Sequence, residues 1–187
     1  MMKNTNIIIV GVGGQGILLT SKILGYLALD MGENVKVSEV HGMSQRGGSV
    51  ITYVRIGSDV HSPLIDPGEA DFVLSFEKLE ALRAEYFLKK DGVLISNTQE
   101  ILPMPVIMGN AQYPKAAPAQ EKTVLLDALK LAEDAGNARA VNIVLLGVLS
   151  RFMEWPREKW EAAIAACVPA KTLEINLKAF RAGAENR

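Results

Sequence analysis

Two short segments of the sequence combine residue types that could bind a ligand or a partner protein. Residues 11–16 read G-V-G-G-Q-G and fit the pattern G-x-G-x-x-G between a β-branched run and an amphipathic stretch. Residues 41–48 read H-G-M-S-Q-R-G-G and join an imidazole, a hydroxyl, an amide and a guanidinium with three glycines. We expect ligand or partner contact from these segments, without catalytic or metal-ligating residues. The candidate contact residues are Gly11, Gly13, Gly14, Gln15, Gly16, His41, Gly42, Met43, Ser44, Gln45, Arg46, Gly47 and Gly48.

The first segment, the glycine turn, has three possible uses. Its bare amides at a helix N-terminus could face the pyrophosphate of NAD or FAD, and Glu39 stands where an acidic residue would bind the ribose. The same amides could hold a phosphate or carboxylate of another ligand, because a helix N-terminus attracts anions in general. The glycines could also serve only to pack the helix closely on the strand. The residues leave these three uses open.

The second segment, the polar loop, follows a predicted strand, where α/β sheets open their ligand crevices. His41 could act as an acid or base near neutral pH. Arg46 could hold a carboxylate or phosphate through two parallel hydrogen bonds. Alternatively, the loop is a glycine-rich connection whose polar groups satisfy one another. Its position favours a binding or docking role.

An alternation of strands and helices positions both segments. Strands are predicted over residues 6–10, 35–40, 49–56, 71–76 and 92–96, with an edge strand over residues 103–108. Helices are predicted over residues 15–31, 77–87, 123–135, 142–152, 157–167 and 169–182. No repeat or linker divides the chain, so we predict a single domain over residues 1–187. Its class is α/β: a three-layer Rossmann-like domain with a mostly parallel sheet and a helical C-terminal part.

Composition excludes several classes of partner and cofactor. The chain has 187 residues with a formal net charge of -1, so no overall field draws it to nucleic acid or to an anionic membrane. No signal peptide or transmembrane stretch is apparent, and we expect a cytoplasmic protein. Cys167 is the single cysteine, which excludes an internal disulfide and a four-thiolate iron–sulfur cluster.

The two segments together resemble the γ-type domain of 2-oxoacid:ferredoxin oxidoreductases. The resemblance starts with G-V-G-G-Q-G-I and S-E-V-H-G-M-S-Q-R-G-G-S-V, residues 11–17 and 38–50. It continues through A-D-F-V-L-S-F-E-K-L-E-A-L-R, residues 70–83, and through Asn142 and Gly147. The closing stretch T-L-E-I-N-L-K-A-F-R-A-G, residues 172–183, looks most like the small β subunit of indolepyruvate:ferredoxin oxidoreductase. The γ subunits of pyruvate, 2-oxoglutarate and branched-chain oxoacid enzymes are similar.

The resemblance implies a division of labour between subunits. Enzymes of this family decarboxylate a 2-oxoacid on thiamine diphosphate, pass electrons through iron–sulfur clusters to ferredoxin, and capture the acyl group with coenzyme A. This chain lacks the Gly-Asp-Gly and Asn-Asn pattern that holds thiamine diphosphate and magnesium. We therefore expect no bound cofactor here, and a large thiamine diphosphate and iron–sulfur subunit as the partner that reaches ferredoxin. An isolated chain is expected to be inactive, and it could cover its docking face by forming a homodimer.

Two other functions compete with the subunit hypothesis. The glycine turn and Glu39 would also suit a free-standing NAD-dependent oxidoreductase, although the polar loop then has no explanation. A non-enzymatic α/β module that binds an anion or a nucleotide is the second alternative. Neither accounts for two separated motifs and a closing helix that match one family in order.

Overall fold

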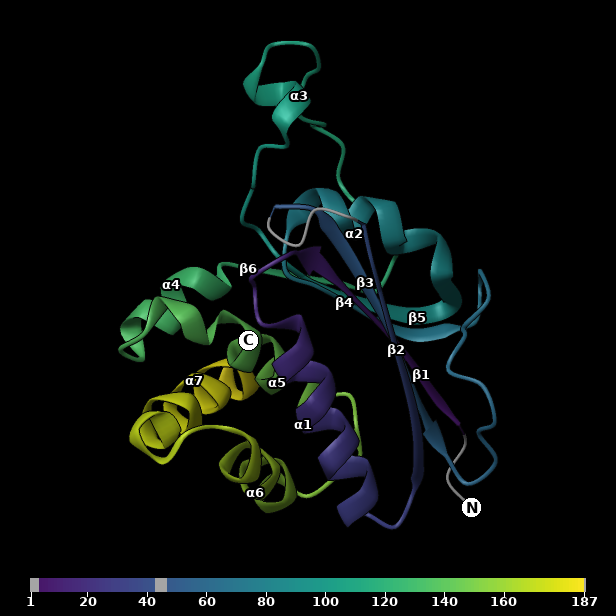
Figure 1. The fold of residues 1–187 in the computed structure, drawn as a ribbon, viewed down its shortest axis with the longest axis vertical. Helices are drawn as coiled ribbons and strands as arrows, with labels where there is room; N and C mark the ends of the chain where they lie inside the picture. Colours follow the sequence, from purple (N-terminus) through teal and green to yellow (C-terminus); the bar gives the residue numbers. More distant parts are fainter. Residues whose placement is uncertain (1–3, 43–46, 187) are drawn as a thin grey trace.

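The computed structural model describes residues 4–42 and 47–186, and Figure 1 shows a twisted sheet between layers of helices. The sheet has six strands in the order β2-β3-β1-β4-β5-β6. The strands are β1 (Thr5–Val12), β2 (Asn34–His41), β3 (Ser49–Gly57), β4 (Ala70–Ser75), β5 (Leu88–Asn97) and β6 (Thr123–Leu126). The helices are α1 (Ile17–Asp30), α2 (Lys78–Ala84), α3 (Met104–Ile107), α4 (Ala128–Asp134), α5 (Val141–Ser150), α6 (Arg157–Cys167) and α7 (Leu173–Glu185).

The direction of the strands decides which loops meet. Neighbours among β1, β4, β5 and β6 pair in parallel, whereas β3 is antiparallel to both β1 and β2. β3 therefore runs against the other strands, and the sheet is mixed but mostly parallel. The carboxyl ends of the other strands and the amino end of β3 lie at one edge, which we call the site edge.

The central strand β1 is buried on both faces because its alternate side chains enter two different cores. Ile7 and Ile9 belong to the larger core, which α1, α4, α5, α6 and α7 cover. Ile8 and Val10 belong to the smaller core beneath α2. The buried β-branched run thus produces a middle layer with helices on both faces. The predicted three-layer α/β class is confirmed.

The larger core depends on a close approach of α5 and α7. Every residue of α5 from Val141 to Leu149 is buried. A Cβ atom added at Gly147 would lie 2.1 Å from the Phe180 carbonyl oxygen, and one at Gly183 would lie 2.0 Å from that of Val144. Glycines therefore let the two backbones touch, which fixes the helical C-terminal part against the sheet.

Several predicted elements are confirmed with small shifts of their ends. The predicted helix over residues 157–167 has the observed bounds of α6. The prediction over residues 77–87 divides into α2 and a 3-10 turn, Glu85–Phe87. The prediction over residues 169–182 begins with the 3-10 turn Ala170–Thr172 before α7. A further 3-10 turn, Ala138–Ala140, precedes α5.

Two predicted elements were wrong in type. Residues 123–135 were predicted as one helix, but Thr123–Leu126 forms β6 and pairs in parallel with β5. Asp127 then caps α4 by accepting a hydrogen bond from the Lys130 amide, so the helix starts five residues later than its apolar pattern suggests. The run T-V-L-L forms a strand because the edge of β5 provides backbone hydrogen bonds to it.

The predicted edge strand over residues 103–108 is instead the short helix α3. Prolines at positions 103 and 105 remove two amides that a strand would use for pairing. The remaining backbone groups bond locally, with the Val106 amide donating to the Pro103 oxygen at 2.9 Å. α3 stands away from the body at the end of an excursion of residues 98–120, which we call the arm (Figure 1).

The first helical connection also differs from a simple βαβ unit. α1 joins β1 to β2, and the two strands point the same way, but β3 lies between them.

In the part of the chain that the structure describes, no helix combines the length and the apolar character needed to cross a bilayer.

Candidate functional site

The glycine turn lies between the end of β1 and the start of α1, at the site edge. Gly14 has φ 101° and Gly16 has φ 86°, a left-handed conformation that glycine adopts without strain. The Gly13 amide donates to the Gly48 carbonyl oxygen at 2.9 Å. This bond joins the glycine turn directly to the end of the polar loop, so the two predicted segments are neighbours in space.

Two residues of the glycine turn are used inside the fold. The Gln15 side-chain oxygen accepts from the Val12 amide at 2.7 Å, while its nitrogen donates to the Phe76 carbonyl oxygen at 3.1 Å. A Cβ atom at Gly11 would lie 2.7 Å from that same Gln15 oxygen. Gln15 therefore bridges the ends of β1 and β4, and the buried Gly11 makes room for the bridge. Gly14, in contrast, is exposed, with open space where its Cβ would be.

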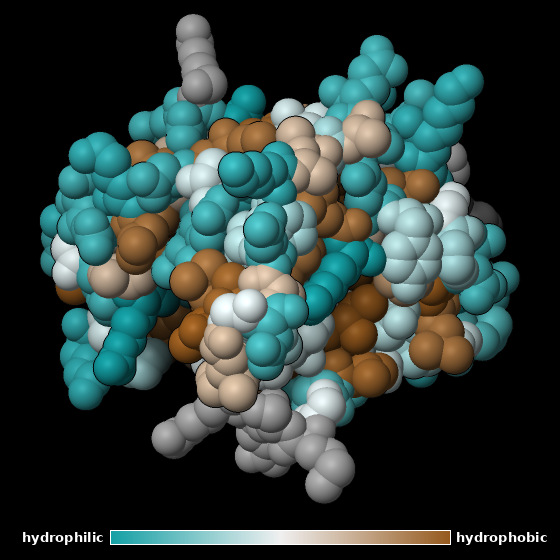
Figure 2. Space-filling view, turned by 90° about the horizontal axis from the view of Figure 1, so that it is seen from above, coloured by the Kyte–Doolittle hydropathy of each residue, from teal (hydrophilic) through white to brown (hydrophobic). Residues whose placement is uncertain are grey.

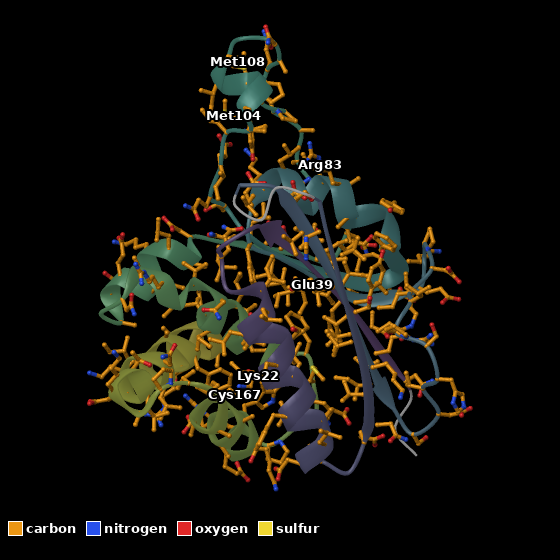
Figure 3. All side chains as sticks on the ribbon, viewed as in Figure 1. Lys22, Glu39, Arg83, Met104, Met108 and Cys167 are labelled. Carbon is orange, nitrogen blue, oxygen red and sulfur yellow. The ribbon has the colours of Figure 1, made fainter. Side chains whose placement is uncertain are left out.

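An open hollow of about 600 Å³ lies on one side of the α1 N-terminus. His41 and Glu39 reach it from β2, and Val50 from β3; Glu39 is labelled in Figure 3. The His41 Nδ1 atom lies 3.1 Å from the Gly42 carbonyl oxygen, and Glu39 accepts a long hydrogen bond from Thr52 at 3.4 Å. The residues that line this hollow are Gly13, Gly14, Gly16, Ile17, Leu18, Leu19, Glu39, His41 and Val50.

A second hollow, of about 560 Å³, lies on the other side of the same helix end. It shares Gly14 and Gly16 with the first but is bordered by Arg139 and Asn142. The Asn142 amide nitrogen donates to the Gly16 carbonyl oxygen at 3.4 Å, and a Cβ atom on Gly16 would lie 3.0 Å from that nitrogen. The glycine turn is therefore a wall between an acidic hollow at Glu39 and a basic hollow at Arg139.

These charges favour different ligands on the two sides of α1. A carboxylate at Glu39 repels a phosphate placed beside it, whereas a guanidinium at Arg139 attracts one. The positive end of the α1 dipole adds to that attraction. An anionic group therefore fits the Arg139 hollow better than the Glu39 hollow.

The dinucleotide arrangement is not reproduced around Glu39. In a simple βαβ unit the acidic residue ends the strand next to β1. Here β3 intervenes, so β2 lies two strand spacings from β1, about 10 Å instead of about 5 Å. Glu39 still lines the hollow, but from farther away than the ribose contact requires.

The described residues form no group of three or more His, Cys, Asp or Glu that could hold a metal ion. Cys167, labelled in Figure 3, is half-buried in α6. Burial raises the pKa of its thiol, and the positive charge of Lys22 opposes that shift. A thiol with a raised pKa is a poor nucleophile at neutral pH.

A buried carboxylate at the start of α2 escaped the sequence analysis. Glu77 is 1% exposed, and its side chain caps α2 by accepting from the Glu80 amide at 3.0 Å. The other carboxylate oxygen accepts from the Ile101 amide at 3.0 Å and from the Tyr113 hydroxyl at 2.5 Å. Burial, and then the hydrogen bond to Glu77, raise the pKa of Tyr113. An acidic residue directly after a buried strand was the only local signal for this cluster.

A second acid on α2 reaches the end of the polar loop. Glu80 is 4% exposed and accepts from the Ser49 hydroxyl at 2.5 Å and from Arg83 at 2.7 Å. Ser49 begins β3 directly after Gly48. The exit of the polar loop is thus tied to α2 on one face and to the glycine turn on the other.

Comparison with known proteins identifies the family at this point. Residues 6–186 match the family of pyruvate ferredoxin/flavodoxin oxidoreductases. The chain belongs to this family. It is similar to indolepyruvate oxidoreductase subunit IorB of Thermococcus kodakarensis, with 46% identity over 97% of this chain and 95% of the relative. The expected place of the chain among small, γ-type subunits of 2-oxoacid:ferredoxin oxidoreductases is confirmed.

Two further relatives differ in how much of their own length matches this chain. The crystal structure of a keto/oxoacid ferredoxin oxidoreductase γ subunit from Geobacter sulfurreducens has 26% identity and a TM-score of 0.76, and covers 97% of this chain and 96% of that one. Ketoisovalerate oxidoreductase subunit VorA of Methanothermobacter marburgensis is 26% identical over 98% of this chain but over only 36% of its own length. In that relative, a domain of this kind is part of a longer polypeptide.

The structure brings part of the predicted contact set together. Gly13, Gly14, Gly16 and His41 line the hollow at Glu39, and Gly48 holds the turn through its carbonyl oxygen. Met43, Ser44, Gln45 and Arg46 lie outside the described residues. Gly11 and Gln15 serve the fold, and Gln15 also lines the hollow at Arg139. Gly42 and Gly47 are exposed at the two described ends of the polar loop. Arg139 was missed, because no nearby residue in sequence signals its approach to the glycine turn.

Proposed function

We propose that this chain is the cofactor-free partner of a large thiamine diphosphate and iron–sulfur subunit, and that it helps to admit substrate and coenzyme A. The observation that carries the proposal is the pair of open hollows on either side of the α1 N-terminus, at the edge where both family motifs meet. Both hollows are open to solvent in the isolated chain. A large subunit placed over this edge would close them into a shared site.

Coenzyme A suits the charge of the Arg139 hollow, since its phosphates are anionic. The guanidinium of Arg139 and the N-terminus of α1 would contact those phosphates. Asn142 holds the turn in place through the Gly16 carbonyl oxygen. In this arrangement the chain binds and orients the co-substrate, while the large subunit carries out the decarboxylation and the electron transfer.

The oxoacid we propose is indolepyruvate or another aryl pyruvate. This choice follows the 46% identity to a subunit of an indolepyruvate oxidoreductase, over nearly the full length of both chains. Pyruvate, 2-oxoglutarate and branched-chain oxoacids are the substrates to compare with it.

Co-purification from the native host tests the proposal. The tagged chain is isolated without oxygen, and the co-purified material is assayed for iron, thiamine diphosphate and 2-oxoacid-dependent ferredoxin reduction. We expect one large subunit with all three properties and the highest rate with an aryl pyruvate. Recovery of the chain alone with bound NAD would overturn the proposal.

Two arginine variants separate ligand contact from docking. Arg139→Ala in an intact complex is expected to raise the KM for coenzyme A about tenfold or more, because a charged contact to a phosphate is lost. Arg151→Ala, an exposed arginine whose hydrogen bond goes to Asn186, is the matched control and should leave that KM unchanged. If Arg139→Ala instead abolishes co-purification, the basic hollow is a docking surface. Arg46→Ala applies the same test to the polar loop.

A further inference from the structure

We propose that the arm, residues 98–120, is a rigid anchor whose apolar tip inserts into an uncharged apolar cleft of the large subunit. This inference rests on the proposed function, because it names the surface by which that partner is held. Three features of the arm carry it: a base fixed by buried charge, a tip with exposed apolar side chains, and a position continuous with the site edge.

The base of the arm is held on both limbs. The buried Glu77 carboxylate accepts from the Ile101 amide on the outgoing limb and from the Tyr113 hydroxyl on the returning limb. The Leu79 amide donates to the same Tyr113 oxygen at 3.0 Å. Gln120 ends the returning limb and donates to the Gly92 carbonyl oxygen at 2.7 Å. An excursion fixed at both limbs loses little conformational freedom on binding, which favours a docking role.

The tip, residues 102–112, exposes large apolar side chains without a neighbour to cover them. Four of them are between 48% and 65% exposed, and no residue of α3 is buried. Figure 3 shows Met104 and Met108 at the far end of the arm, away from the sheet. Figure 2, which views the molecule from the side on which α3 projects, shows several brown hydrophobic areas between teal hydrophilic ones on that face. The exposed side chains are Leu102, Met104, Ile107 and Met108.

The backbone of the tip is closed by its own hydrogen bonds. The Asn110 amide donates to the Pro105 oxygen at 2.8 Å, and the Met108 amide donates to the Met104 oxygen at 2.9 Å. Gly109, with φ 75°, ends the turn. The tip therefore offers no strand edge for pairing, and its contribution to binding comes from side-chain burial. Methionine suits such a contact because its flexible side chain fills irregular cavities.

The charge pattern selects the occupant. Residues 102–112 contain no Asp, Glu, Lys, Arg or His, so burying them favours an uncharged receiving surface. The main hollows on the described surface each have a charged side chain in their wall: Glu39, Arg139, Lys78, Asp71 or Glu154. A second copy of this chain therefore offers no matching cleft among them. A cleft on a different protein is therefore the better match for the tip.

The arm continues the edge that the large subunit is proposed to cover. Gln99 and Ile101, at its base, line the Arg139 hollow together with Gly14 and Gly16. A specific interface uses about 20–30 residues on each side, more than the tip supplies. A partner seated over the hollows would meet the arm and the site edge together. The tip then provides the buried apolar anchor, and the rim of the hollows provides the polar contacts.

Charge placed on the tip tests this inference in the co-expressed complex. Ile107→Glu and Met104→Glu each put a carboxylate into the proposed apolar cleft. We expect dissociation on dilution, followed by mass photometry, to occur at a concentration at least about tenfold higher than for wild type. Leu64→Glu is the matched control, because Leu64 is 59% exposed, close to the 61% of Ile107, but lies in the loop between β3 and β4. This control should dissociate like wild type.

A photo-crosslinking residue at position 108 identifies the occupant independently of affinity. We expect cross-links to the large subunit that carries iron and 2-oxoacid-dependent activity. Cross-links to a second copy of this chain, or tip variants that dissociate like Leu64→Glu, would overturn the arm as the anchor. After either of these two outcomes, the proposed function still stands if the wild-type chain co-purifies with an active large subunit. If wild type recovers no such subunit, both proposals are wrong.

Discussion

The glycine turn and the base of the arm lie at the same edge of the sheet but use polar groups in opposite ways. At the turn, Gly14 and His41 are exposed and border open hollows. At the arm base, Glu77 is buried, and backbone amides and Tyr113 satisfy its carboxylate. Exposed polar groups can contact a ligand, whereas buried polar groups form hydrogen bonds that hold neighbouring segments in place. The edge therefore combines a contact region and a region that fixes its shape.

The largest expected effect tests the positioning half of this comparison. Glu77→Ala removes the acceptor for one buried donor and two part-buried donors, and each orphaned donor costs up to about 1–3 kcal/mol. We expect the free energy of unfolding to fall by about 3 kcal/mol or more, measured by chemical denaturation. Glu100→Ala breaks only the exposed ion pair with Lys78 and should cost less than about 1 kcal/mol. Equal losses in the two variants would contradict the distinction.

A smaller effect separates two glycines of the same turn. Gly16→Ala forces a left-handed alanine and brings its Cβ to 3.0 Å from the Asn142 amide nitrogen, at a cost of about 2–3 kcal/mol. Gly14→Ala meets the same backbone strain in open space and should cost about 1 kcal/mol. Thermal unfolding of both variants measures the difference. If Gly14→Ala is the more damaging, Gly14 has a packing role that the structure does not show.

The pH dependence of stability probes the hydroxyl at the arm base. Because the pKa of Tyr113 is raised above its ordinary value of 10.0, its neutral hydroxyl stabilises the fold fully below pH 10.0. That contribution is lost as the pH rises beyond this value. Tyr113→Phe should cost about 1–2 kcal/mol at neutral pH, and its deficit relative to wild type should shrink above pH 10.0. Denaturation curves between neutral and alkaline pH measure the stability of both proteins. A deficit of Tyr113→Phe that stays constant across this range would contradict the stabilising role of the neutral hydroxyl.

The smallest expected effect concerns the connection between the two regions. Ser49→Ala removes the hydroxyl that donates to Glu80 at 2.5 Å, while Arg83 still contacts the same carboxylate. We expect a loss of about 1 kcal/mol and little change in overall structure. Ser58→Ala, whose side chain lies in the exposed turn after β3, provides the comparison. A loss of several kcal/mol would mean that the two regions form one cooperative unit.

The sequence by itself determined the α/β class, most of the elements and the position of both motifs after strands. Periodicity and glycine placement are local properties, so they predict β1, α1, β3 and α6 well. The pairing of Gly13 with Gly48 agrees with the expectation that loops after strands gather at one edge.

Only the tertiary structure decided the roles of the individual polar groups. The run T-V-L-L became a strand because β5 was beside it, and β3 entered between β1 and β2 through pairing that no local pattern encodes. Arg139 approaches the glycine turn, and Glu77 binds both limbs of the arm, across separations that periodicity does not reach. Burial is set by all the elements around a side chain. It therefore distinguishes Glu77, whose buried carboxylate is held by hydrogen bonds within the fold, from Glu39, whose carboxylate lines an open hollow.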